Sequence, residues 1–134
     1  SDRNVAMVYA VGPNCGVEKR GRLVDQMSIE SFLEVVQTLG SAIVAAICEY
    51  NRQAVQSQSE PKLPRIEIIR ICLLSGGIYM HPDASKMQVA TSLIQGLVQS
   101  GREDKDGDVA PCLDFAWDED VFSKAWHELG LDVK

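Results

Sequence analysis

Three short apolar runs alternate along the chain with longer segments of helical periodicity. Val5–Val11 is the first, rich in β-branched residues and ended by Gly12-Pro13-Asn14. The second occupies residues 66–74 and stops at Ser75-Gly76-Gly77, and the third occupies residues 109–117. Near-continuous apolar runs of this length are typical of strands buried in a parallel sheet. We therefore expect three parallel strands.

Apolar residues recur every three or four positions in the segments that follow these runs. This spacing predicts helices near residues 28–56, 85–100 and 119–129. Ser85 and Gln88 have the spacing of a capping box at the start of the second helix. Gly40 lies inside the first helix, where a glycine costs about 1 kcal/mol, and this indicates close packing. The alternation of strands and helices predicts an α/β layer fold with right-handed crossovers.

Composition fits one globular domain over residues 1–134. The chain has a mass of 14.7 kDa, and 46% of its residues are hydrophobic and 24% charged. No apolar run approaches the roughly 20 residues needed to cross a bilayer, and the N-terminus lacks a signal-peptide pattern. We expect an intracellular protein, cytoplasmic or nuclear, with no membrane partner. The missing initiator Met indicates a processed chain or a piece of a longer one.

The net charge of −6 is concentrated in one window. Residues 102–120 hold eight acids and two bases, whereas the remainder is balanced. A basic footprint is missing, which predicts no duplex nucleic acid partner. The small cluster Lys19-Arg20-Gly21-Arg22 has the charge to meet an anion, but three cations in a glycine-containing loop more often form a solvated turn.

The sequence offers little metal chemistry. Its four cysteines lie far apart, at Cys15, Cys48, Cys72 and Cys112, and the two histidines, His81 and His127, stand alone. A structural zinc site needs clustered ligands, so we expect no metal and no cofactor. The last three cysteines lie in apolar patterns and are predicted to be buried, which fits a reducing compartment.

In open α/β folds, ligands bind at the carboxyl ends of the strands. Three segments are expected there, namely residues 12–16, 75–82 and 117–120. In the second, Gly76 and Gly77 permit a close approach of the backbone, and consecutive N–H groups can face an anion. A Gly-Gly pair after a strand is more often a simple turn, and neither a Walker A loop nor a dinucleotide fingerprint is present.

Ser75 and His81 invite a hydrolase hypothesis, which is weak because no acid is placed to orient the imidazole. Arg70 interrupts the second apolar run and is expected on an edge or a solvated face. His127 is expected on a polar or boundary face of the last helix.

The ordered set of strand ends resembles the C-terminal half of a macrodomain, the ADP-ribose-binding module. The first strand ends in Ala10-Val11-Gly12-Pro13, the second enters Leu74-Ser75-Gly76-Gly77-Ile78-Tyr79, and the third ends in Phe115-Ala116-Trp117-Asp118. The resemblance implies a three-layer α/β/α domain with a mostly parallel sheet flanked by helices. It covers nearly the whole chain, but only about half of the family's pattern.

The resemblance also implies a ligand site and partners. The diphosphate of ADP-ribose, or of a related nucleotide diphosphate, would lie on the loop, and the adenine would stack on an aromatic residue. The implied ligand-binding residues are Ser75, Gly76, Gly77, Ile78, Tyr79 and Trp117. The implied partner is ADP-ribose or an ADP-ribosylated protein.

The family's N-terminal half is missing, with its adenine-reading Asp, its Asn-rich segment and its glycine-rich loop. No catalytic residue is therefore assigned, and enzymatic activity is left open. One alternative is a degenerate macrodomain-like piece with a structural or protein-interaction role. A weaker alternative is an ADP-ribosyl hydrolase completed by the missing half. Without the missing half, either the first two strands pair directly or a second polypeptide completes the sheet.

Overall fold

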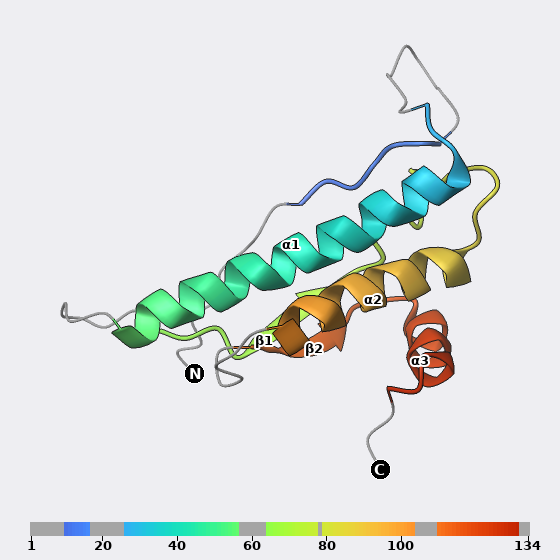
Figure 1. Ribbon diagram of the computed structural model, residues 1–134. Coiled ribbons are helices and arrows are strands. Elements are labelled where there is room, and N and C mark those ends of the chain that lie inside the picture. Colours follow the sequence, from blue (N-terminus) through green and yellow to red (C-terminus); the bar gives the residue numbers. More distant parts are fainter. Residues whose placement is uncertain (1–9, 17–25, 57–63, 78, 104–109, 132–134) are drawn as a thin grey trace.

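Three helices and two strands make up the part of the chain that the structure describes. The computed structural model describes residues 10–16, 26–56, 64–77, 79–103 and 110–131. The elements follow in the order α1 (Ile29–Gln56), β1 (Ile68–Ile71), α2 (Lys86–Glu103), β2 (Cys112–Phe115) and α3 (Glu119–Glu128) (Figure 1). The predicted helices and the second and third strands are thereby confirmed. Residues 5–9 of the first predicted strand lie outside the described residues, and Ala10 and Val11 are not in a strand.

β1 and β2 form a parallel pair, with Ile68 opposite Cys112 and Ile71 opposite Phe115. Within the described part of the chain, they are the whole sheet. One face of the pair packs against α1 and α2, which lie side by side (Figure 1). The opposite face is open, because the side chain of Ile68 is 63% exposed there.

The expected three-layer α/β/α fold with a mostly parallel sheet is therefore wrong. The described residues form a helix-rich structure of two layers with two short strands. The prediction failed because the apolar run at residues 66–74 looked buried on both faces. Its isoleucines in fact alternate between the core, where Ile71 is buried, and the open face, which carries Ile68. Successive side chains of a strand point to opposite faces of the sheet. The sequence of one strand does not reveal what covers the second face.

α1 and α2 approach so closely that their backbones touch. A Cβ built on Gly96 of α2 would lie 1.9 Å from the carbonyl oxygen of Gln37, and one on Gly40 would lie 2.7 Å from that of Leu93. Two hydroxyls join the helices at the same level. Ser41 Oγ donates to the Gly96 carbonyl (3.1 Å), and Ser100 Oγ donates to the Ser41 carbonyl (2.7 Å). The close packing expected from Gly40 is confirmed.

The starts of α1 and α2 follow their predicted caps. The Ser31 N–H donates to Ser28 Oγ (3.1 Å) just before α1. The capping box is reciprocal: the Gln88 N–H donates to Ser85 Oγ (3.2 Å), and the Ser85 N–H donates to Gln88 Oε1 (2.9 Å). These bonds satisfy N–H groups that the first turn of a helix leaves without partners.

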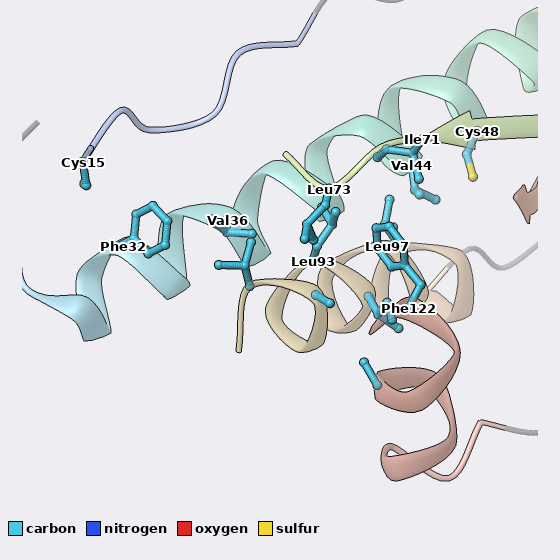
Figure 2. Close-up of a cluster of buried hydrophobic side chains, with 14 residues drawn as sticks. Cys15, Phe32, Val36, Val44, Cys48, Ile71, Leu73, Leu93, Leu97 and Phe122 are labelled. Atoms are coloured by element: carbon cyan, nitrogen blue, oxygen red, sulfur yellow. The ribbon is translucent and has the colours of Figure 1, made fainter. Parts of the chain in front are cut away.

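The apolar stripe of α1 is the centre of the core. Phe32, Val36 and Val44 are at most 2% exposed and meet residues of α2, β1 and α3 (Figure 2). Over Ile29–Ala54, α1 is also long and apolar enough to cross a membrane by length and composition alone. The expectation that no segment meets this measure was too strong. The core helix of a soluble protein passes the same measure, and 33% of the most apolar stretch of α1 is buried.

The predicted burial of three cysteines holds for one. Cys48 is buried on α1, whereas Cys72 and Cys112 are exposed. Both exposed thiols have the phase of the strand positions that face away from the helices. The apolar neighbours that suggested burial belong to the other face.

Asn51 of α1 fixes the entry into β1. Its side chain is fully buried (0% exposed), and it bonds to one residue through both ends of its amide. The Nδ2 group donates to the Ile66 carbonyl (2.8 Å), and Oδ1 accepts from the Ile66 N–H (2.8 Å). The amide therefore acts as a strand partner and holds β1 against the end of α1.

The helix contact yields a test with a matched control. Gly96→Ala should lower the free energy of unfolding by about 1–3 kcal/mol, because the new methyl group meets backbone that has little room to move. Gly101→Ala on the same helix should raise it by up to about 1 kcal/mol, because a Cβ there has its nearest neighbour at 4.0 Å. Urea titration followed by circular dichroism measures both. Equal stability of the two variants would contradict the backbone contact.

The Asn51 bridge yields a second test. Asn51→Ala should destabilise the fold by about 2–4 kcal/mol, because both polar groups of the Ile66 backbone lose their partner. Gln53→Ala, at an exposed site two residues along α1, should change stability by less than about 0.5 kcal/mol. A cost for Asn51→Ala as small as that of the control would show that the bridge contributes little.

Candidate functional site

Two of the three segments predicted at the carboxyl edge of the sheet bond to each other there, and the third contacts the start of α2. Ser75 Oγ, after β1, donates to the Pro13 carbonyl (2.8 Å), and the Cys15 N–H donates to the Tyr79 carbonyl (2.9 Å). Lys86 Nζ, in the first turn of α2, contacts the Asp118 carboxylate (3.1 Å) just after β2. Two loops and the starts of α2 and α3 therefore share this edge.

Most of the predicted loop is engaged in holding the fold. Ser75 is 8% exposed and has a left-handed backbone (φ 58°). A Cβ on the buried Gly76 would lie 2.3 Å from the Leu73 side chain, whereas one on the exposed Gly77 meets nothing within 4 Å. Gly77 is thus where the backbone offers room to a ligand. Tyr79 is half-buried, Ile78 lies outside the described residues, and a ligand role for these residues stays a prediction.

Trp117 is the most exposed aromatic side chain at this edge. Its relative exposure is 75%, and it has a left-handed backbone (φ 59°), as does Asp118 (φ 48°). This turn breaks the alternation of β2, so Trp117 does not share the buried face that Leu113 and Phe115 occupy. The contact between Asp118 and Lys86 ties the turn to α2. The result is a flat ring in solvent, and the next residue, Asp118, contacts the ammonium group of Lys86.

His81 joins the same loop to the start of α1. The Asp83 N–H donates to His81 Nδ1 (3.0 Å), and Nε2 lies 2.9 Å from the Met27 carbonyl. Because Nδ1 accepts, the proton of a neutral ring is on Nε2, which donates to Met27. The Phe32 ring packs beside the imidazole at 5.7 Å between centroids.

These contacts leave no Ser–His pair. Ser75 Oγ donates to Pro13 and both nitrogens of His81 bond to backbone, so the geometry of the hydrolase hypothesis is missing. Arg70 lies on the open face, as expected, and its Nε donates to Asp114 (2.8 Å). His127 is exposed on α3. In the described part of the chain, no three His, Cys, Asp or Glu side chains gather into a potential metal site.

A shallow groove lies between β2 and α3. Its volume is about 220 Å³, and its lining is aromatic and acidic, made by Asp114, Phe115, Glu119, Phe122, Ser123 and Trp126. Phe115 and Phe122 stack in its floor with centroids 4.2 Å apart. Two carboxylates oppose a phosphate, so the groove suits an anionic ligand less well than the carboxyl edge does.

The carboxyl edge also receives both flanks of the chain's densest group of cations. Lys19, Arg20 and Arg22 lie in residues 17–25, outside the described residues. The chain enters this segment after Cys15, bonded to Tyr79, and leaves it before Met27, bonded to His81. One loop, residues 79–81, thus holds both flanks. Sequence reasoning missed this, because residue spacing does not show which loop anchors the two flanks.

Comparison with known proteins gives two curated relatives. They are the DNA/RNA-binding protein ALBA4 of Plasmodium falciparum (isolate 3D7) and the protein of the same name from Plasmodium yoelii yoelii. Each is 38% identical over 133 residues, which is 98% of this chain and 32% of the relative. The chain therefore spans about a third of the length of these relatives. No family model matches the chain, and no solved structure matches it significantly.

These relatives overturn the macrodomain resemblance and the function, ligand and partners that it implied. A similarity over nearly the whole chain outweighs three short motifs. Gly-Pro and Gly-Gly after a strand are common turn residues, and their order was not specific enough. Two predicted partners are therefore wrong, namely ADP-ribose or a related nucleotide diphosphate and an ADP-ribosylated protein. The second polypeptide that would complete a macrodomain sheet is withdrawn with them. The two alternative functions, a degenerate macrodomain-like piece and an ADP-ribosyl hydrolase, are not supported either.

The prediction of no duplex nucleic acid partner is overturned as well, because both relatives are named as DNA- and RNA-binding. It rested on net charge, which averages over the whole chain. An acidic window and a basic cluster can act at separate places on one surface.

The Ser75 contact is testable by two substitutions. Ser75→Ala should cost about 1 kcal/mol of stability, because the Pro13 carbonyl loses its donor. Ser75→Gly loses the same bond, but glycine adopts the left-handed backbone without strain. Its free energy of unfolding should therefore be about 1 kcal/mol higher than that of Ser75→Ala. Thermal unfolding of both variants checks the order. A glycine variant less stable than the alanine variant would contradict the strained geometry.

Proposed function

We propose that this chain binds nucleic acid at the carboxyl edge of its sheet. The observation that carries the proposal is that one loop, residues 79–81, bonds to both flanks of the segment that holds Lys19, Arg20 and Arg22. The two DNA/RNA-binding relatives support the same function. Cations next to a phosphate backbone release its counterions, which is the main source of affinity in such complexes.

Stacking is the second contribution. Trp117 is 75% exposed beside the loop edge, and an aromatic face of this kind accepts an unpaired base of any identity. Lys86 compensates the carboxylate nearest the ring, since it contacts Asp118. Gly77 leaves room for a phosphate to approach the backbone. Trp117 and Gly77 thus keep a ligand role, with nucleic acid as the ligand.

An intracellular location fits a protein that binds DNA or RNA, which reside inside cells. We place it in the cytoplasm or the nucleus, where either ligand is available. The expectation that residues 1–134 form one domain is part of the same proposal.

The test is a fluorescence anisotropy titration of the chain against labelled single-stranded RNA and duplex DNA of equal length. Replacing Lys19, Arg20 and Arg22 together by Ala should weaken binding. It should also reduce the slope of log affinity against log salt concentration by the equivalent of about two to three phosphate contacts. Trp117→Ala should weaken single-strand binding about tenfold to a hundredfold, the value of one stacked base. Arg65→Ala removes an exposed cation before β1, at the opposite edge, and is the matched control.

Two results would contradict the proposal. One is the absence of binding to either probe at low salt. The other is a triple variant that binds like the wild type while Arg65→Ala binds more weakly, because the cations at the opposite edge would then carry the interaction.

A further inference from the structure

We propose that the groove between β2 and α3 binds a cationic side chain, and that its occupant is an arginine in a basic segment of a protein partner. The inference goes beyond the proposed function and does not depend on it. Its basis is an aromatic floor with carboxylates at the rim, a combination that recognises an organic cation. The described residues that line the groove include no cation of their own.

The aromatic rings of the groove pack against one another. Phe115 of β2 and Phe122 of α3 stack with centroids 4.2 Å apart and 17° between their planes. The Trp126 ring stands at 62° to Phe115, with its centroid 6.3 Å away, and therefore forms a wall beside this floor. Phe122 is buried, whereas Phe115 and Trp126 are half-buried and offer ring surface to a ligand. A cation within about 6 Å of such a ring is attracted by its π-electrons, most strongly by those of tryptophan.

Two carboxylates lie at the rim. Asp114 belongs to β2, and Arg70 Nε donates to its Oδ2 at 2.8 Å, so this carboxylate already accepts a guanidinium. Glu119, in the first turn of α3, is exposed, and its side chain has no ion pair or hydrogen bond with another described residue. The rim therefore has one carboxylate that is available to a ligand and one that a ligand would share with Arg70.

The start of α3 offers a competing reason for an acid at Glu119, because carboxylates in a first turn stabilise the helix dipole. Asp120 lies in the same turn and serves that purpose equally well, but it does not line the groove. The groove positions on α3 recur at the three- and four-residue spacing of one helix face. Glu119 thus shares a face with Phe122 and Trp126, at the end of an aromatic stripe.

Size and shape favour one side chain, and arginine over lysine. The groove has a volume of about 220 Å³, below the roughly 300–1,000 Å³ of sites that enclose a small molecule. A guanidinium is planar, stacks on aromatic rings and binds a carboxylate through two parallel hydrogen bonds. An ammonium group is compact and more strongly hydrated. α3 carries three acids and one lysine, so it also attracts basic neighbours of the arginine.

The experiment titrates the nitrogen-15-labelled chain with a blocked glycine pentapeptide that carries arginine at its centre. The chain has two tryptophans, so the indole N–H resonances of Trp117 and Trp126 report on the carboxyl edge and on the groove separately. Trp126→Phe assigns them by the resonance that it removes. The Trp126 resonance should shift at millimolar arginine peptide. Peptides with lysine, or with citrulline as an uncharged analogue, should bind about twofold to fivefold more weakly, because they lose the stacking plane or the charge.

Two substitutions in the first turn of α3 test whether the groove itself is the site. Glu119→Gln should weaken binding of the arginine peptide about twofold to fivefold, which corresponds to the loss of an exposed ion pair. Asp120→Asn removes the same charge from the same turn, outside the groove, and should weaken binding less than Glu119→Gln does. Both side chains are exposed, so both variants should fold, and circular dichroism verifies this.

Four results would overturn the proposal. One is a Trp126 resonance that stays in place at millimolar arginine peptide, and another is equal binding of the citrulline peptide. A third is equal weakening by Glu119→Gln and Asp120→Asn, because general attraction to α3 would then explain binding. The fourth is a Trp126 resonance that shifts only with protein concentration or with single-stranded RNA, which would assign the groove to a second copy of this chain or to a nucleotide base. The anisotropy titration tests the proposed function independently of these results.

Discussion

The backbone contact between α1 and α2 is the constraint on which the rest of the structure depends. Gly40 and Gly96 remove the side chains that would hold the helices apart, and Ser41 and Ser100 bridge the gap with hydroxyl bonds. Helices that touch in this way act as one slab, and their combined apolar faces are wide enough to cover the short parallel pair. Two strands of four residues have little stability of their own, so the slab determines where they lie.

The slab also decides where ligand chemistry can occur. α2 and α3 are each the next element after a strand, and α1 begins just after Met27, which His81 contacts, so the starts of all three helices lie on the carboxyl-edge side of the sheet (Figure 1). Helix starts carry partial positive charge and exposed N–H groups. The capping box of α2 satisfies some of these groups internally. In the proposed function, the remaining recognition comes from side chains and loops, namely the basic segment, Gly77 and Trp117.

The sequence was sufficient for features that local chemistry specifies. Helix periodicity, the Ser85–Gln88 capping box and the close packing at Gly40 all follow from residues a few positions apart. Features set by distant neighbours were out of reach. The exposure of Cys72 and Cys112 depends on what covers the second face of the sheet. The exposure of Trp117 depends on a left-handed turn at a residue that is not glycine, and no spacing rule signals that turn. The macrodomain resemblance failed because its motifs were strand-end turns that many α/β proteins share.

The net charge misled for a geometric reason that the fold makes clear. Of the eight acids in residues 102–120, Glu103 ends α2, three lie in residues 104–109, outside the described residues, and four lie at Asp114 or beyond. α2 has 18 residues and is therefore about 27 Å long, whereas charges in physiological salt are screened over about 8 Å. A charge at the end of α2 therefore has little influence on a phosphate at the start of the helix. The acids that are near it are the group around Asp118, one of which Lys86 already neutralises. Net charge therefore does not exclude a binding surface at the carboxyl edge, where Lys86 pairs with Asp118 and where the described flanks of the segment that holds Lys19, Arg20 and Arg22 are bonded.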